Sequence, residues 1–146
     1  MISDEVVDKF NKLLSSIYSN LMLREIEAIK NGIYRDLTFH EIHTIEAIGD
    51  LTNGTVSEIA KTVGVTQSTM STMIDKLVKK GIAERIRSDK DRRVLHIHLT
   101  KKGRAAYKEH EDVHRQVTRN WLKALSKEEQ EFTFDIMKSI DAAYKK

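Results

Sequence analysis

The sequence lacks several features that define large classes of protein. Its 146 residues include no cysteine, no proline and only one tryptophan. Without cysteine there is no disulfide, no thiolate metal site and no thiol nucleophile, and without proline long helices can continue unbroken. No apolar run approaches the roughly 18 residues that a membrane-spanning helix requires, and the opening stretch MISDEVVDKF has no apolar signal-peptide core. We therefore expect a single cytoplasmic domain, residues 1–146, with no membrane partner.

Motifs of catalysis and of cofactor binding are also missing. The chain has no Gly-x-Ser-x-Gly, no glycine-rich phosphate-binding loop and no HExxH. Most of the six glycines instead lie at the ends or starts of expected helices. They are Gly32, Gly49, Gly64, Gly81 and Gly103. The sequence therefore predicts a protein that is not an enzyme and that uses no cofactor.

Positive charge is concentrated in one segment of the chain. Residues 79–104 contain ten lysines and arginines and three acids, a net charge of +7, whereas the whole chain carries only +3. A basic segment in an otherwise acidic chain points to a polyanionic partner. Charge alone leaves open the alternative of a charged hairpin that is only solvated.

Capping signals and hydrophobic periodicity predict six helices and one β-hairpin. Ser3 is expected to cap the first helix, and capping boxes begin at Thr38, Thr55 and Ser126, each followed three residues later by glutamate. The expected helices are residues 3–29, 38–49, 55–63, 67–80, 100–125 and 126–143, and the expected strands are residues 82–87 and 93–99.

The stretch TVSEIAKTVGVTQSTMSTMIDKLVKKG, residues 55–81, has the form of a helix-turn-helix. Its second helix has an apolar stripe of Met70, Met73, Ile74, Leu77 and Val78. The opposite face carries small uncharged donors and acceptors: Gln67, Ser68, Thr69, Ser71 and Thr72. Such a face suits the major groove of DNA. A plain helical hairpin is the alternative, but exposed helix faces usually carry residues of higher helix propensity.

Residues 91–103, DRRVLHIHLTKKG, resemble the wing and exit signature of the MarR family of winged-helix transcriptional regulators, and the resemblance extends over essentially the whole chain. It implies a mainly α fold with a small β-wing. Residues 35–100 would form the winged helix-turn-helix lobe, and residues 1–34 and 101–146 the dimerisation helices. The apolar stripes of the terminal helices fit either a self-contained bundle or a dimer, and the resemblance implies a homodimer on a pseudo-palindromic operator in double-stranded DNA.

The resemblance also assigns roles on DNA to individual residues. Arg93 would enter the minor groove, which attracts a guanidinium, and Asp91 would pair with Arg93 to hold the wing tip. The residues expected in the major groove are Thr66, Gln67, Ser68, Thr69 and Thr72. The expected phosphate contacts are Lys80, Arg85, Arg87, Lys90 and Arg92.

Six histidines raise the question of an effector. His96 and His98 share one face of a wing strand, which favours a structural role or one close to phosphate. The segments HEIHTIEAIG and RRVLHIHLTKKG resemble the FabT-like branch of the family most closely, which implies a repressor of fatty-acid synthesis genes with long-chain acyl-acyl carrier protein as corepressor. The effector pocket is then expected at Leu21, Ile42, His43, Ile45, His110, Val113 and His114.

A metal site is the alternative that the histidines leave open. His110 and His114 are four residues apart on an expected helix, and such a pair can bind zinc where a third ligand converges. The zinc-responsive branch of the MarR family has histidines at similar places, which would make His43 the third ligand. The FabT-like resemblance and the absence of cysteine favour no metal, so a zinc-responsive or small-ligand-responsive regulator remains the second reading.

Overall fold

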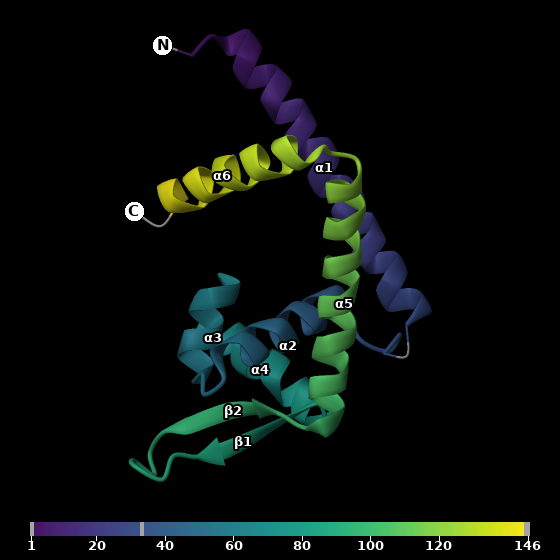
Figure 1. Cartoon of the computed structure of the whole chain (residues 1–146). Helices are drawn as coiled ribbons and strands as arrows, with labels where there is room; N and C mark the ends of the chain where they lie inside the picture. Colours follow the sequence, from purple (N-terminus) through teal and green to yellow (C-terminus); the bar gives the residue numbers. More distant parts are fainter. Residues whose placement is uncertain (1, 33, 145–146) are drawn as a thin grey trace. The chain divides into compact units, whose positions relative to one another are not determined.

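A computed structural model describes residues 2–32 and 34–144 of the chain (Figure 1). The chain divides into two compact units, Met1–Asp112 and Val113–Lys146. Its elements are α1 (Asp4–Asn31), α2 (Phe39–Leu51), α3 (Val56–Val63), α4 (Gln67–Lys79), β1 (Ala83–Arg87), β2 (Leu95–Leu99), α5 (Lys101–Lys123) and α6 (Lys127–Tyr144). The predicted fold, helical with a small two-stranded wing, is confirmed. Among the described residues, no helix is long and apolar enough to cross a membrane.

The predicted capping boxes form as expected. Thr38 and Thr55 each accept a hydrogen bond from the backbone of the glutamate three residues on, and that glutamate accepts one from the cap backbone. Ser126 and Glu129 make the same reciprocal pair at the start of α6. Ser3 occupies the N-cap of α1 as predicted, but its side chain makes no cap hydrogen bond. The prediction that the Ser3 hydroxyl caps this helix is therefore wrong.

The core of the first unit lies between α2, α3, α4 and the hairpin. The largest of its fully buried apolar side chains are Ile45, Ile48, Ile59, Met70, Ile74, Leu77, Ile82 and Ile97. The apolar stripe predicted for the fourth helix is confirmed, with Met73 and Val78 packed at its edge. Burying this stripe turns the opposite, polar face of α4 toward solvent.

The two strands pair antiparallel, with Ala83 opposite Leu99 and Arg87 opposite Leu95. Both strands are shorter than predicted: β1 begins one residue later, at Ala83, and β2 begins at Leu95 because residues between Arg87 and Leu95 form the turn. There the Ser88 amide donates to the Val94 carbonyl at 3.0 Å and the Val94 amide donates to the Asp91 carbonyl at 2.9 Å. These bonds form a tight turn at the tip of the hairpin, and this turn carries basic side chains.

The base of the hairpin is fastened to the start of α5. The Thr100 hydroxyl lies 2.7 Å from the Gly81 carbonyl and 3.1 Å from the Ile82 carbonyl, and the Thr100 oxygen accepts from the Gly103 amide at 3.1 Å. The Arg104 guanidinium donates to the Leu99 carbonyl. These bonds make the wing and the first turn of α5 one continuous structure.

The second unit consists of the later part of α5 and helix α6. Gln130 joins them, because its side-chain amide donates to the carbonyls of Leu122 and Leu125 at 2.8 and 3.1 Å. No described residue of α6 is buried. Its exposed large apolar side chains are Phe132, Phe134, Ile136, Met137, Ile140 and Tyr144.

Candidate nucleic-acid interface

The polar face of α4 is exposed where the helix begins. Thr66 occupies the N-cap and its hydroxyl oxygen accepts from the Thr69 amide at 3.2 Å. Gly64 precedes it in the left-handed conformation, with φ of 76°, and ends α3 by donating its amide to the Ala60 carbonyl. The first turn of α4 contains no acid. All five predicted major-groove residues are exposed: Thr66, Gln67, Ser68, Thr69 and Thr72.

Gln67 is the side chain on this face best suited to base recognition, because an amide can bond an adenine edge in two places. We expect Gln67→Ala to change which duplexes a random library yields, with about 1–3 kcal/mol of discrimination lost at one base pair per half-site. Arg92→Ala is the comparison, because a phosphate contact lowers affinity evenly across sequences. Identical sequence preferences for Gln67→Ala and the unchanged protein would contradict a base contact by Gln67.

The wing tip presents its basic side chains outward. Lys90, Arg92 and Arg93 are exposed, and so is Arg87 at the end of β1. The Asp91 carboxylate accepts from the Arg93 backbone amide at 2.9 Å. Within residues 2–32 and 34–144, no ion pair joins the Asp91 carboxylate to the Arg93 guanidinium. The predicted pairing of these residues is therefore made through the backbone, as aspartates commonly do two residues before a turn amide.

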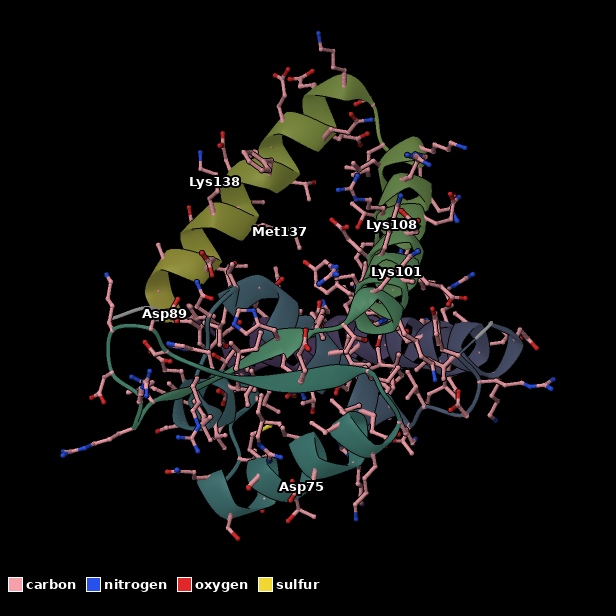
Figure 2. The ribbon with its side chains drawn as sticks, turned by 90° about the horizontal axis from the view of Figure 1, so that it is seen from below. Asp75, Asp89, Lys101, Lys108, Met137 and Lys138 are labelled. Atoms are coloured by element: carbon pink, nitrogen blue, oxygen red, sulfur yellow. The ribbon has the colours of Figure 1, made fainter. Side chains whose placement is uncertain are left out.

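Arg85 has a partner that the sequence did not reveal. Its guanidinium lies 2.8 Å from the carboxylate of Asp75. Figure 2 shows Asp75 on α4. This ion pair links β1 to α4. Arg85 was predicted to contact phosphate, but its charge is matched by Asp75 in this arrangement.

We expect Asp75→Asn to tighten DNA binding roughly two- to fivefold, the range of a partly exposed ion pair. The change removes an acid from α4 and releases the Arg85 guanidinium toward phosphate, so the salt dependence of binding should also become steeper. Fluorescence anisotropy at three or more salt concentrations measures both effects. Glu84→Gln removes the same charge from β1 without releasing an arginine; an equal gain in that variant would assign the effect to net charge alone.

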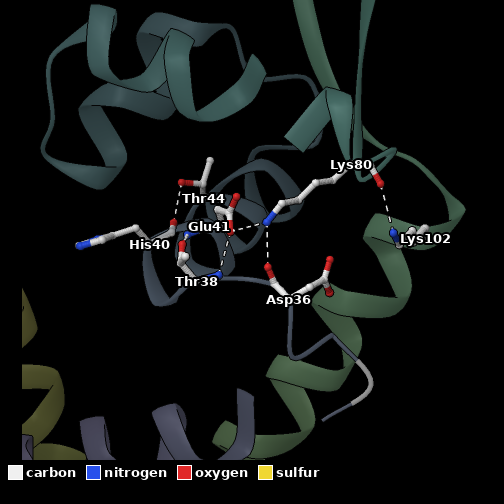
Figure 3. A network of polar contacts seen from close by, with 7 residues as sticks. All are labelled: Asp36, Thr38, His40, Glu41, Thr44, Lys80 and Lys102. Atoms are coloured by element: carbon white, nitrogen blue, oxygen red, sulfur yellow. Dashed lines mark hydrogen bonds and ion pairs between the residues drawn. The ribbon is translucent and has the colours of Figure 1, made fainter. Parts of the chain in front are cut away.

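Lys80 also differs from its predicted role. Its ammonium donates to the Glu41 carboxylate and to the Asp36 carbonyl, both at 2.9 Å, as Figure 3 shows. Lys80, predicted to contact phosphate, forms an internal ion pair in this structure. The partner Glu41 lies 39 residues earlier in the chain, and no local pattern links the two.

Two of the predicted histidines lie together with acids. His43, Glu46 and His110 each offer a ligand atom, and these atoms all lie within 4.8 Å of one another. His43 Nδ1 is 3.0 Å from the Glu46 carboxylate, and His43 Nε2 is 3.6 Å from that of the buried Glu25. The hydrogen bond with Glu46 and the negative charge of both acids outweigh burial and raise the pKa of His43. Glu46 could have been found from sequence, because it follows His43 by three residues on one helix.

A pocket of about 280 Å³ opens beside this cluster. It is lined by His43, Glu46, Ala47, Asp50, Thr62 and Val63. Of the predicted effector-pocket residues, only His43 lines it. Ile42 and Ile45 do not line this pocket and are buried in the core, at 4% and 0% exposed. Leu21 is half-buried on α1, whereas Val113 and His114 belong to the second unit.

An exposed polar helix behind a glycine turn, followed by a basic two-stranded wing, defines a winged-helix DNA-binding protein. Comparison with known proteins agrees: the model of the MarR family matches residues 37–95. Streptococcus pneumoniae FabT, solved in complex with DNA, is 32% identical, with a TM-score of 0.85 over 95% of this chain and 97% of that one. The chain belongs to the MarR family. The fold and the described site are those of a MarR-type DNA-binding transcriptional regulator.

Two further proteins are similar to this chain. A MarR family protein from Bacillus stearothermophilus has the same fold, with a TM-score of 0.89, 22% identity and complete coverage of both chains. The uncharacterized HTH-type transcriptional regulator YhjH of Bacillus subtilis is 25% identical over 115 residues, which are 79% of this chain. The chain spans 65% of the length of YhjH.

Proposed function

We propose that the protein is a homodimeric repressor of fatty-acid synthesis genes, with long-chain acyl-acyl carrier protein as its corepressor. The observation that carries this proposal is the 32% identity with FabT along nearly the whole of both chains, since FabT was solved on DNA. The FabT-like segment HEIHTIEAIG lies in α2, which lines the pocket. The segment RRVLHIHLTKKG lies in the wing and the first turn of α5, and its wing part is proposed to face DNA.

The dimer is supported by apolar surface at both ends of the chain. Helix α1 exposes a series of large apolar side chains: Val6, Val7, Phe10, Leu13, Leu14, Ile17 and Tyr18. Exposed apolar surface of this extent is unusual on a monomer, and α6 exposes a comparable series. We assign residues 1–34 and 101–146 to dimerisation and residues 35–100 to the DNA-binding lobe.

Dimerisation would set the geometry of the operator. Two copies of α4 about one DNA turn apart would read two half-sites of a pseudo-palindrome. In each half, the polar face of α4 would lie in the major groove and Arg93 in the adjacent minor groove. Arg87, Lys90 and Arg92 would contact phosphates of the backbone between these two grooves.

The corepressor is proposed to act through the pocket between α2 and α3. Ala47 and Val63 supply apolar lining, and His43, Glu46 and Asp50 supply polar groups at the same place. An effector changes DNA affinity only if it binds the two arrangements of the dimer unequally. The acyl chain would therefore have to favour the arrangement in which both copies of α4 match the operator.

The test begins with selection of duplexes from a random library by metal-stripped protein. Fluorescence anisotropy on the selected duplex, and on a palindromic fragment of a fatty-acid synthesis promoter, is then measured with and without long-chain acyl-acyl carrier protein. We expect a palindromic selection and tighter binding with the acyl form than with unacylated carrier. Unchanged affinity with the acyl form would contradict the corepressor, and a selection without symmetry would contradict the dimeric operator.

A zinc-responsive regulator is the second candidate, and the convergence of His43, Glu46 and His110 favours it. Two imidazoles and a carboxylate form a common zinc ligand set, and Glu25 lies near His43 as a further acid. The residues present thus fit zinc, which would hold α2 and α5 together when bound. Titration calorimetry of the metal-stripped protein with zinc, repeated with His110→Ala, tests this candidate. Equal zinc affinity in both proteins would contradict a site at these residues.

A further inference from the structure

The C-terminal end of the recognition helix is held by its own set of bonds. Lys80 directly follows α4, and its side chain reaches Glu41 and the Asp36 carbonyl at the start of α2 (Figure 3). On its other side, the Lys80 carbonyl accepts from the Lys102 ammonium of α5 at 3.1 Å. We call the contact of Lys80 with Glu41 and Asp36 the Lys80 clasp. Together with Lys102, it joins the ends of three helices.

Glu41 is a demanding partner because its carboxylate is buried. The residue is only 5% exposed, and one carboxylate oxygen accepts both from the Lys80 ammonium and from the Thr38 backbone amide, at 2.9 and 2.8 Å. Burial opposes its negative charge, but the hydrogen bonds of Thr38 and Lys80 and the charge of Lys80 keep the pKa of Glu41 below its ordinary value. A buried carboxylate that stays charged requires its cation. If Lys80 moved from Glu41 to a phosphate, the buried negative charge of Glu41 would lose its cation.

Lys80 also lies at the wrong end of α4 for the major groove. Thr66 begins the helix, and fourteen residues at 1.5 Å each place Lys80 about 20 Å further along its axis. We propose that Lys80 is a positioning residue: its clasp fixes the direction in which α4 leaves α2, and it supports DNA affinity without contacting phosphate. The proposal rests on α4 being the helix that reads DNA, and on nothing about the effector.

The two possible roles of Lys80 predict opposite signs for a change at Glu41. Glu41→Gln removes a negative charge from a DNA-binding protein, so electrostatics alone predicts equal or tighter binding. If Lys80 acts through the clasp, Glu41→Gln should weaken binding to the selected duplex about tenfold. A loss of this size is typical of the interaction energy between residues in one hydrogen-bond network. Glutamine keeps the side-chain length and an oxygen that can accept from Thr38, so this variant preserves the cap of α2.

The salt dependence of binding separates the roles independently. Lys80→Met should weaken binding to the selected duplex about tenfold and leave the slope of log affinity against log salt unchanged. Loss of a phosphate contact would instead reduce that slope by about 0.9. Lys79→Met is the matched control, because Lys79 is the exposed neighbour and loses the same charge. Lys80→Arg keeps a cation for Glu41 and should recover most of the affinity.

The double variant Glu41→Gln with Lys80→Met completes the cycle, and we expect it to bind about as weakly as either single variant. Melting curves and dimer content of every variant accompany the titrations, which are run well below the lowest melting temperature. If Lys80→Met does not fold, Glu41→Gln and Lys80→Arg still show whether loosening the clasp weakens or strengthens DNA binding. Tighter binding by Glu41→Gln, a reduced salt slope for Lys80→Met, or unchanged affinity in both variants would each overturn the proposal.

Discussion

Replacing Gly103 with alanine is expected to destabilise the protein by about 2–3 kcal/mol, the cost of forcing a group into a filled site. A methyl group at this position would lie 2.0 Å from the Ile82 carbonyl oxygen and 3.2 Å from the Leu99 side chain. The Ile82 oxygen is backbone and also meets the hydroxyl of Thr100, so it cannot move aside without opening the base of the wing. Steric cost therefore exceeds the roughly 1 kcal/mol by which alanine favours a helix over glycine.

Urea denaturation followed by circular dichroism measures this effect, at several protein concentrations because dimerisation would link stability to concentration. Lys101→Ala, on an exposed position of the same first turn, is the control and should change stability by less than about 0.5 kcal/mol. A Gly103→Ala protein as stable as the unchanged one would show that α5 does not approach Ile82 this closely.

Local signals were sufficient to predict most of the elements. Each capping box at Thr38, Thr55 and Ser126 is complete within four residues, so the sequence contains both halves of every bond. The stripe of α4 is equally local, because side chains three and four residues apart share a helix face. Its burial then leaves Gln67, Ser68, Thr69 and Thr72 exposed to solvent.

The partners of the basic residues could not be predicted in the same way. The ion pairs of Lys80 with Glu41 and of Arg85 with Asp75 form because separate elements pack together. In neither pair does the separation of the residues along the sequence indicate a contact. The consequence is functional: two of the five predicted phosphate contacts have internal acids as partners. A count of lysines and arginines therefore overestimates the charge that this surface offers to DNA.

The α2 residues predicted for the effector pocket divide between two sides of that helix. In α2, Ile42, Ile45 and Ile48 follow one another at intervals of three and are buried in the core, a stripe that the helical period could have separated from the pocket side. His43 and Glu46 lie on the other side, beside the pocket. Ile42 and Ile45 were predicted to line the pocket of an acyl chain, whereas the periodicity of the same helix assigns them to the core.

Removing the Arg93 side chain is expected to cost about 1–3 kcal/mol of DNA binding per contact, or roughly 5- to 150-fold in affinity. Arg93 is exposed at the wing tip and its backbone is held by Asp91, so alanine removes the guanidinium and leaves the turn intact. A guanidinium prefers the narrow minor groove of A·T-rich sequence. The unchanged protein should accordingly favour A·T pairs where the wing lies, and Arg93→Ala should lose that preference. Anisotropy with duplexes that differ only in those flanking pairs measures both quantities.

Asp91 provides the decisive control for how the arginine is supported. Because the Asp91 carboxylate accepts from the Arg93 amide at 2.9 Å, asparagine can accept the same bond, and Asp91→Asn should bind DNA at least as tightly as the unchanged protein. Asp91→Ala loses the acceptor, loosens the tip and should weaken binding in the direction of Arg93→Ala. If Asp91→Asn were instead as weak as Asp91→Ala, the charge of the aspartate would be acting on the guanidinium when DNA is bound. The wing tip would then change its contacts on binding, and its turn would not be the form that reads the groove.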